Sequence, residues 1–152
     1  MNLTEEQIEE NNKLIALFMG WSFGIVTGWL HGSREGCYKK DEQGEITDFY
    51  SIYNLKYHSD WNRLMPVVEK IERIKPFYSV SNSAAFWYDD ETDTEDRSRI
   101  QYLCIISDNR SRIRINSANY YPERESKIIA TWYAVVEFIK WYNSQNNLTP
   151  QT

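Results

Sequence analysis

The segment Tyr102–Ile106 is apolar at every position, and it constrains the fold more than any other part of the chain. Alternate side chains of a β-strand point to opposite faces, so a run that is apolar on both sets must bury both faces. We therefore expect the strand Arg99–Ile106 to be central and covered on both sides. Neighbouring strands are predicted at Phe77–Tyr88, with an interruption at Ser81–Ser83, and at Ser111–Asn116, whose alternation is typical of a half-exposed strand.

The first predicted helix has clear end signals, and the last has the strongest apolar pattern. The first begins at Glu5, because Thr4 is a favourable N-cap residue and Gln7 completes a capping box, and Gly20 is placed to end it. The last runs from Glu125 to about Asn143 and presents a wide apolar face. Both helices therefore bring an apolar surface to the predicted core.

The second predicted helix contains a proline. Ser59 or Asp60 caps it, and its apolar spacing continues to about Ile74. Pro66 removes a backbone donor and clashes with the preceding turn. The helix is therefore either kinked at Pro66 or begins near Met65.

These elements predict an α+β fold. The specific form is an α/β/α sandwich, in which the N-terminal, central and C-terminal helices cover a small, mainly antiparallel sheet. A chain of 152 residues suits one domain, which we place at 1–145, followed by a polar flexible tail at 146–152. The region Trp21–Tyr53 combines glycines with aromatic residues without a sustained period, so short strands and packed loop are both open there.

Composition excludes several classes of protein. A hydrophobic content of 41% excludes an intrinsically disordered chain, and a formal net charge of −5 argues against general nucleic-acid binding. No apolar run is long enough to span a membrane, and the N-terminus lacks a basic signal-peptide region. We therefore expect a cytoplasmic protein without membrane contact. Cys37 and Cys104 form neither a disulfide framework nor a zinc motif, and no metal or other cofactor is expected.

Several long blocks on the predicted helices carry a resemblance to known proteins. They are Asn12–Ala16 with Phe18–Gly20, Leu55–His58 with Trp61 and Leu64–Glu72, and Val135–Asn143. They resemble a family of small uncharacterised proteins of bacteriophages and prophages, which is similar in turn to the phage ABA-sandwich domain. The resemblance implies that fold and a phage or mobile-element setting, and it implies no reaction. Relatives have an Asp and an aromatic residue where this chain has Asn62 and Arg63, so no role of that acidic position carries over.

Three arginines form a candidate anion site. Arg112 and Arg114 share one face of their predicted strand, and Arg99 on the adjoining strand is expected to join them. Guanidinium groups beside Tyr120 and Tyr121 would hold a phosphate or nucleotide. The alternative is that these arginines neutralise the acidic run nearby, an arrangement that is common on protein surfaces.

The sequence around His58 and the acidic run each allow two interpretations. His58, Ser59 and Asp60 suggest a nucleophile and a base, but capping of the second helix explains the same residues without any Gly-x-Ser-x-Gly motif. The run Asp89–Asp96 offers oxygen ligands for a cation, but it lacks the glycine and the spacing of an EF-hand. A solvated hairpin loop is favoured for this run.

The last helix has a second apolar stripe beside its main face. This stripe contains Ala130, Ala134, Phe138 and Trp141, so the helix either packs against two neighbours or donates surface to a homo-oligomer or a partner. Phe138 and Trp141 are the predicted partner contacts. Six tryptophans and eleven tyrosines exceed what one small core needs, which indicates an exposed aromatic surface for binding, with Phe138 and Trp141 as its best candidates.

Two functions from different classes follow. The first is a phage-encoded, non-enzymatic binding protein that occupies a host protein or sequesters a small nucleotide-like ligand, with a role against host defence. The second is a small hydrolase or nucleotide-processing enzyme, in which the three arginines hold a phosphate and His58 or Asp60 acts as the base. No convincing catalytic set supports the second function, so the sequence favours the first.

Overall fold

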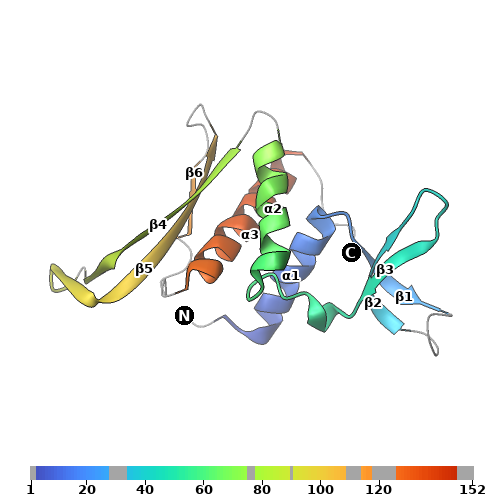
Figure 1. Cartoon of the computed structure of the whole chain (residues 1–152), viewed down its shortest axis with the longest axis horizontal. Helices are drawn as coiled ribbons and strands as arrows, with labels where there is room; N and C mark the ends of the chain where they lie inside the picture. Colours follow the sequence, from blue (N-terminus) through green and yellow to red (C-terminus); the bar gives the residue numbers. More distant parts are fainter. Residues whose placement is uncertain are drawn as a thin grey trace. The chain divides into compact units, whose positions relative to one another are not determined.

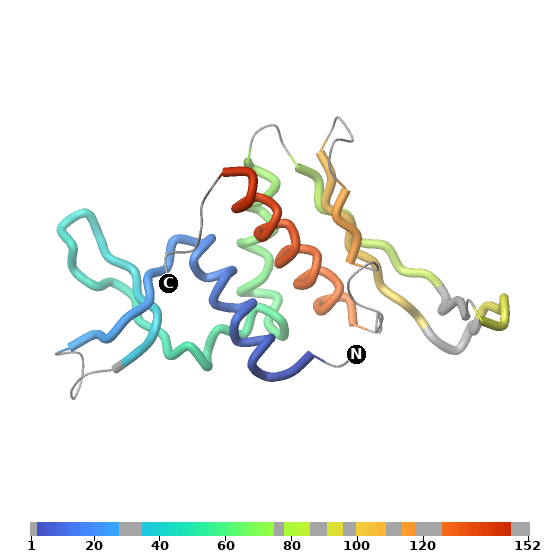
Figure 2. Tube along the Cα trace, turned by 180° about the vertical axis from the view of Figure 1, so that it is seen from behind, coloured from blue at the N-terminus to red at the C-terminus, as the bar shows by residue number. Residues whose placement is uncertain are grey.

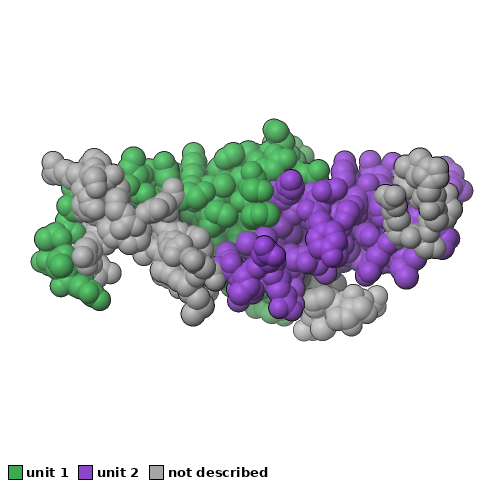
Figure 3. Space-filling model, turned by 90° about the horizontal axis from the view of Figure 1, so that it is seen from below, with its two compact units in different colours: residues 1, 58–152 green, residues 2–57 purple. Residues whose placement is uncertain are grey.

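The computed structural model describes residues 3–27, 34–74, 78–89, 91–108, 114–117 and 126–146. These ranges contain α-helices and two antiparallel sheets, which confirms the predicted α+β class (Figure 1). The contacts divide the chain into two compact units, unit 1 with residues 1 and 58–152 and unit 2 with residues 2–57 (Figure 3). The prediction of one domain spanning 1–145 stays a prediction.

Unit 2 begins with helix α1, Glu5–Phe18, as predicted. Thr4 Oγ1 accepts a hydrogen bond from the Gln7 amide (3.2 Å), and the Gln7 side chain accepts one from the Thr4 amide (2.9 Å). This capping box satisfies two amides that have no partner within the helix.

The C-terminus of α1 is closed by Gly20. Its φ of +86° lies in the left-handed region, where glycine carries no steric penalty. Its amide donates to the Leu17 carbonyl, and the Trp21 amide donates to the Ala16 carbonyl (3.0 Å each). This pair of bonds is a Schellman motif, and it sends the chain from the helix directly into the first strand.

The rest of unit 2 is a three-stranded antiparallel sheet followed by a short 3₁₀ helix (Figure 2). The elements are β1 (Ser22–Val26), β2 (Arg34–Lys40), β3 (Ile46–Tyr50) and η1 (Ile52–Asn54), and the spatial order is β1-β2-β3. The sequence allows short strands or packed loop in the region Trp21–Tyr53. Its described residues form the three strands β1, β2 and β3 and the helix η1. The turn between β2 and β3 is held by Asp41, whose carboxylate accepts from the amides of Gln43 and Glu45.

Gly36 lets the Phe49 ring and the Tyr50 carbonyl group lie close to the central strand of this sheet. A Cβ atom at Gly36 would lie 2.5 Å from the Tyr50 carbonyl oxygen and 2.7 Å from the Phe49 ring. At Gly24 a Cβ atom would meet only the Tyr38 ring, at 3.7 Å. The two glycines of the sheet therefore differ sharply in the space around them.

Unit 1 begins with helix α2, Trp61–Arg73. Of the two predicted caps Asp60 serves, and its carboxylate accepts from the Asn62 amide at 2.9 Å. Pro66 lies inside the continuous helix, so the alternative start near Met65 is wrong. Fully buried Leu64, Val67 and Ile71 hold the helix on its core side.

The sheet of unit 1 has the order β4-β5-β6, so the central position predicted for Tyr102–Ile106 is confirmed. The strands are β4 (Tyr78–Asp89), β5 (Thr94–Asp108) and β6 (Arg114–Asn116). The interruption predicted at Ser81–Ser83 is wrong, because β4 is continuous there. The irregularity is a register shift between Phe86 and Trp87.

Helix α3, Lys127–Gln145, begins two residues later than predicted, with Ser126 as its N-cap. It contacts β5 and β6, while α2 contacts β4, and both helices lie on the same side of the sheet (Figures 1 and 2). Burial of the central strand is accordingly unequal. Cys104 and Ile106 are fully buried, whereas Leu103 and Ile105 are half-buried.

The strands thus form two sheets, where the sequence predicted one small sheet. The described pairings all join strands that follow each other in the chain, which is the common arrangement for antiparallel sheets, and helix α2 separates β3 from β4. Strands β1, β2 and β3 lie before α2 and pair among themselves, whereas β4, β5 and β6 lie after it.

We predict that Gly36→Ala destabilises the protein by about 2 kcal/mol, because the added Cβ overlaps backbone and ring atoms. The measurement is the urea midpoint of unfolding. Gly24→Ala is the matched control, and it should change the midpoint little, since its Cβ makes an ordinary contact. Equal midpoints for the two variants would contradict the steric argument.

Candidate binding surface

Of the three predicted arginines, Arg114 alone has a described side chain. Arg114 is exposed on β6, directly opposite Ser107 of β5. Arg99 and Ser107 both belong to β5. Arg99 comes eight residues earlier, so the backbones of the two residues are about 26 Å apart along the strand. The described part of β6 thus pairs with the end of β5 that lies away from Arg99, and the anion site of Arg99, Arg112 and Arg114 stays a prediction. Arg112, Tyr120 and Tyr121 lie outside the described residues, as does the side chain of Arg99.

The predicted partner contacts on α3 differ from each other. Phe138 is fully buried, with its ring centroid 4.9 Å from that of Tyr78, and so it belongs to the core. Ala130 and Ala134 are also fully buried. Trp141 is half-buried, 6.1 Å from the Tyr78 ring. The sequence allows this stripe either to pack against neighbouring elements or to form a surface for a partner. Ala130, Ala134 and Phe138 pack against neighbouring elements, and Trp141 is the one member that is partly exposed.

His58 and Asp60 make structural contacts at the start of α2. The His58 ring packs edge-on against Trp132 of α3, with centroids 6.1 Å apart. The Asp60 carboxylate caps the helix and lies 3.6 Å from Arg63 Nε. The capping interpretation of this segment is confirmed for Asp60.

The acidic run lies at the tip of the β4–β5 hairpin, in agreement with the favoured interpretation. Residues 91–93 form the turn, the side chains of 91–95 are exposed, and Asp93 has a φ of +54°. Within the described ranges, no group of three or more His, Cys, Asp or Glu is placed to hold a metal ion.

A different cluster lies on one face of the unit 2 sheet. The Trp21 and Tyr50 rings meet edge to face at 5.3 Å, and Lys39 Nζ lies 4.7 Å from the centre of the Trp21 ring. All three side chains are half-buried. We call Trp21, Lys39 and Tyr50 the aromatic–lysine face.

Strand register brings these three residues together. Phe23 of β1 and Tyr50 of β3 both pair with Cys37 of β2. Trp21 lies two residues before Phe23, and Lys39 two residues after Cys37, so each points to the same side as its neighbour. No local motif links the three positions, which are 11 or more residues apart, and only the strand pairing reveals the cluster.

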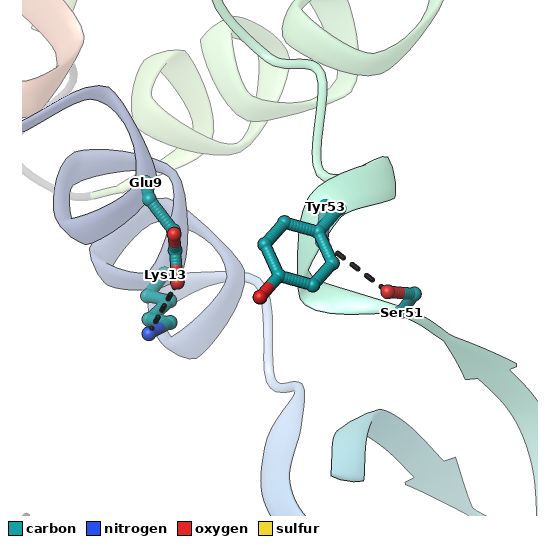
Figure 4. Close-up of polar contacts among 4 residues, drawn as sticks. All are labelled: Glu9, Lys13, Ser51 and Tyr53. Atoms are coloured by element: carbon teal, nitrogen blue, oxygen red, sulfur yellow. Dashed lines mark hydrogen bonds and ion pairs between the residues drawn. The ribbon is translucent and has the colours of Figure 1, made fainter. Parts of the chain in front are cut away.

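Two large apolar side chains of unit 2 are strongly exposed. Ile25 on β1 is 70% exposed, and Tyr53 on η1 is 76% exposed. Figure 4 shows the Tyr53 ring pointing from η1 toward α1, where Glu9 and Lys13 form an ion pair of 2.9 Å. The Tyr53 amide donates to the Ser51 hydroxyl at 3.4 Å, which fixes the backbone that carries the ring.

The aromatic–lysine face combines groups that are common at binding surfaces. Tryptophan and tyrosine combine a large apolar body with a polar tip, and a cation over an indole ring contributes about 0.5–1 kcal/mol at an exposed site. Asp48 pairs directly with Lys39 across the sheet, so the face carries both signs of charge.

Unit 1 buries ionisable groups near α3. Burial raises the pKa of the Cys104 thiol from 9.0 to about 12, while a hydrogen bond from Thr131 acts in the opposite direction. Burial also raises the pKa of Tyr78, and the nearby Asp108 and Tyr142 raise it further. Both groups therefore stay protonated at neutral pH.

Comparison with known proteins returned no match: no family model, no curated protein and no solved structure is similar to this chain. None of the helices within the described ranges combines the length and the apolar character that a membrane span needs.

We predict that stability falls as the pH rises above about 9, because the unfolded thiol of Cys104 ionises before the folded one. The stabilising contribution is fully present below the unfolded pKa and disappears as the pH approaches the folded value. Above about pH 9, Cys104→Ala should make the slope of the unfolding free energy against pH less steep. The difference from wild type should correspond to the binding of at most one proton. Ile106→Val shortens a buried side chain of the same strand without removing an ionisable group, so it should leave the slope unchanged. An unaltered slope in Cys104→Ala would contradict the prediction.

Proposed function

We propose that the protein is a non-enzymatic binding protein that uses the aromatic–lysine face to contact a host protein. The phage or mobile-element setting comes from the resemblance of its helices to the small phage and prophage family. In that setting, the protein acts in the host cytoplasm and interferes with a host defence function.

The observation that carries the proposal is the packing of Lys39 and Tyr50 around a half-buried Trp21. Tryptophan and tyrosine are enriched among the residues that dominate binding energy at protein interfaces. Because Trp21 is already held by two neighbours, it loses little conformational freedom when a partner covers it.

A protein partner suits this surface better than a small ligand. The cluster lies on the face of a sheet, and Ile25, four residues after Trp21 on the same side of β1, adds exposed apolar area. Protein interfaces combine such apolar anchors with a polar rim, and Lys39 and Asp48 supply polar groups beside the rings.

The enzymatic alternative has less support. It requires the arginines to meet a base, yet Arg99 and Arg114 are about 26 Å apart along the sheet. Asp60 is engaged by the Asn62 amide and by Arg63, and the His58 ring packs on Trp132. Asp60 and His58 thus each have structural contacts of their own.

We predict that Trp21→Ala abolishes capture of the partner while the protein stays folded. The measurement is quantitative mass spectrometry of proteins and small molecules retained from host lysate by the immobilised protein. A partner that wild type retains should fall at least about tenfold with the variant, the usual scale for loss of an interface tryptophan.

Trp61→Ala is the matched control, because Trp61 is 36% exposed but lies on α2 in unit 1. It should capture the partner as wild type does, and Trp141→Ala tests the predicted contact on α3 in the same way. Equal capture by Trp21→Ala and wild type would contradict the assignment of the face. Retention of a small molecule alone would contradict the choice of a protein partner.

A further inference from the structure

Among the described strands, β1 is an edge strand whose own sequence lacks the usual protection against pairing. Natural sheets shield their edges with charged side chains, proline, bulges, very short strands or covering elements. Trp21–Thr27 contains no charged residue and no proline, and β1 pairs with β2 over five positions without a register shift. Its Ile25 is 70% exposed.

The other described edge strands each carry such protection. β3 contains the charged Asp48, and the pairing beside it shifts register at Lys39/Lys40. β4 shifts register at Phe86/Trp87 and contacts α2. β6 has three residues, one of which is Arg114. The open edge at β1 is therefore specific to that strand among those described.

We propose that β1 pairs with β1 of a second copy of this chain, antiparallel and centred on Gly24. The two sheets would then join into one sheet of six strands. This inference does not rest on the proposed function, since it needs neither the host partner nor Lys39 and Tyr50.

The side chains of β1 are complementary to themselves in this register. Pairing about Gly24 places Phe23 of one copy opposite Ile25 of the other, twice, on the side of the sheet where Ile25 is exposed. Aromatic residues opposite β-branched ones are favourable cross-strand pairs. Ser22 falls opposite Val26, so no side chain of the strand meets an identical bulky one.

Charge opposes the pairing of two copies less at this edge than at β3. Each chain has a formal net charge of −5, so two copies repel each other over most of their surface. The run Trp21–Thr27 is uncharged, so no like charges face each other where the strands would meet. An approach through β3 would instead bring Asp48 of each copy toward the same contact.

Glycine at the centre allows this contact. The Tyr38 ring lies beside Gly24 on one side of the sheet, where it covers the backbone that has no side chain of its own. A contact between two five-residue strands is small compared with stable interfaces, so weak association that depends on concentration is expected.

The first test is sedimentation velocity of the full chain over a wide concentration range. Wild type should shift from monomer to dimer as the concentration rises. Ile25→Lys should weaken dimerisation at least about tenfold, because it introduces a charge into the strand contact. Met65→Lys is the matched control, since Met65 is also exposed, at 42%, but lies on α2, and the net charge changes equally.

The second test fixes the register. Gly24→Cys should yield a covalent dimer with a short bis-maleimide, because the two cysteines face each other, and the Cβ is tolerated at this position. Ser22→Cys should not, because residue 22 faces residue 26 and lies about 14 Å from its own counterpart. Cys37 and Cys104 are buried and give no background in the folded protein.

A wild type that stays monomeric throughout, or an Ile25→Lys variant that dimerises as Met65→Lys does, would overturn the proposal. Equal cross-linking of Ser22→Cys and Gly24→Cys would overturn the register. If Ile25→Lys fails to fold, as judged by circular dichroism, the pair of cysteine variants decides alone. Loss of host-protein capture in Trp21→Ala with dimerisation intact would separate this proposal from the proposed function.

Discussion

The packing of α3 on β5 and β6 is the contact on which the structure of unit 1 depends. Small side chains at Ala130 and Ala134 let the helix approach its neighbours closely, and the fully buried Trp132 and Phe138 fill the space around them. The same packing removes water from Cys104, which is why the pKa of its thiol is raised so far. Helix placement, sheet burial and the ionisation of the core thus share one cause.

Local signals in the sequence predicted most of the helices and part of the sheet. The Thr4–Gln7 capping box and the Asp60 cap are formed by residues within three positions of each other, so reading the chain is enough to find them. The alternation at Arg114 and Ile115 was equally local, and Ile115 is buried while Arg114 is exposed. Such features need no knowledge of tertiary pairing.

Strand partners and register could not be predicted in the same way. The sequence does not state that β6 pairs only with residues 105–107 of β5, and this short pairing is what separates Arg99 from Arg114. The aromatic–lysine face shows the same limit, because Trp21, Lys39 and Tyr50 meet only through two strand pairings. The surplus of aromatic residues predicted an exposed aromatic surface and placed it at Phe138 and Trp141, because the cluster around Trp21 depends on non-local contacts that the sequence does not reveal.

The Schellman motif at the end of α1 links the core of unit 2 to Trp21. The Trp21 amide is bonded to the carbonyl of Ala16, a residue with no exposed surface. The backbone that carries the indole is thus tied to the last turn of a helix rather than to a loose connection. Fraying of the helix end would break this hydrogen bond and allow the backbone of Trp21, and with it the ring, to move. The position of Trp21 therefore depends on the last turn of α1 as well as on Lys39 and Tyr50, and solution conditions that unwind this turn would loosen the aromatic–lysine face without altering any of its side chains.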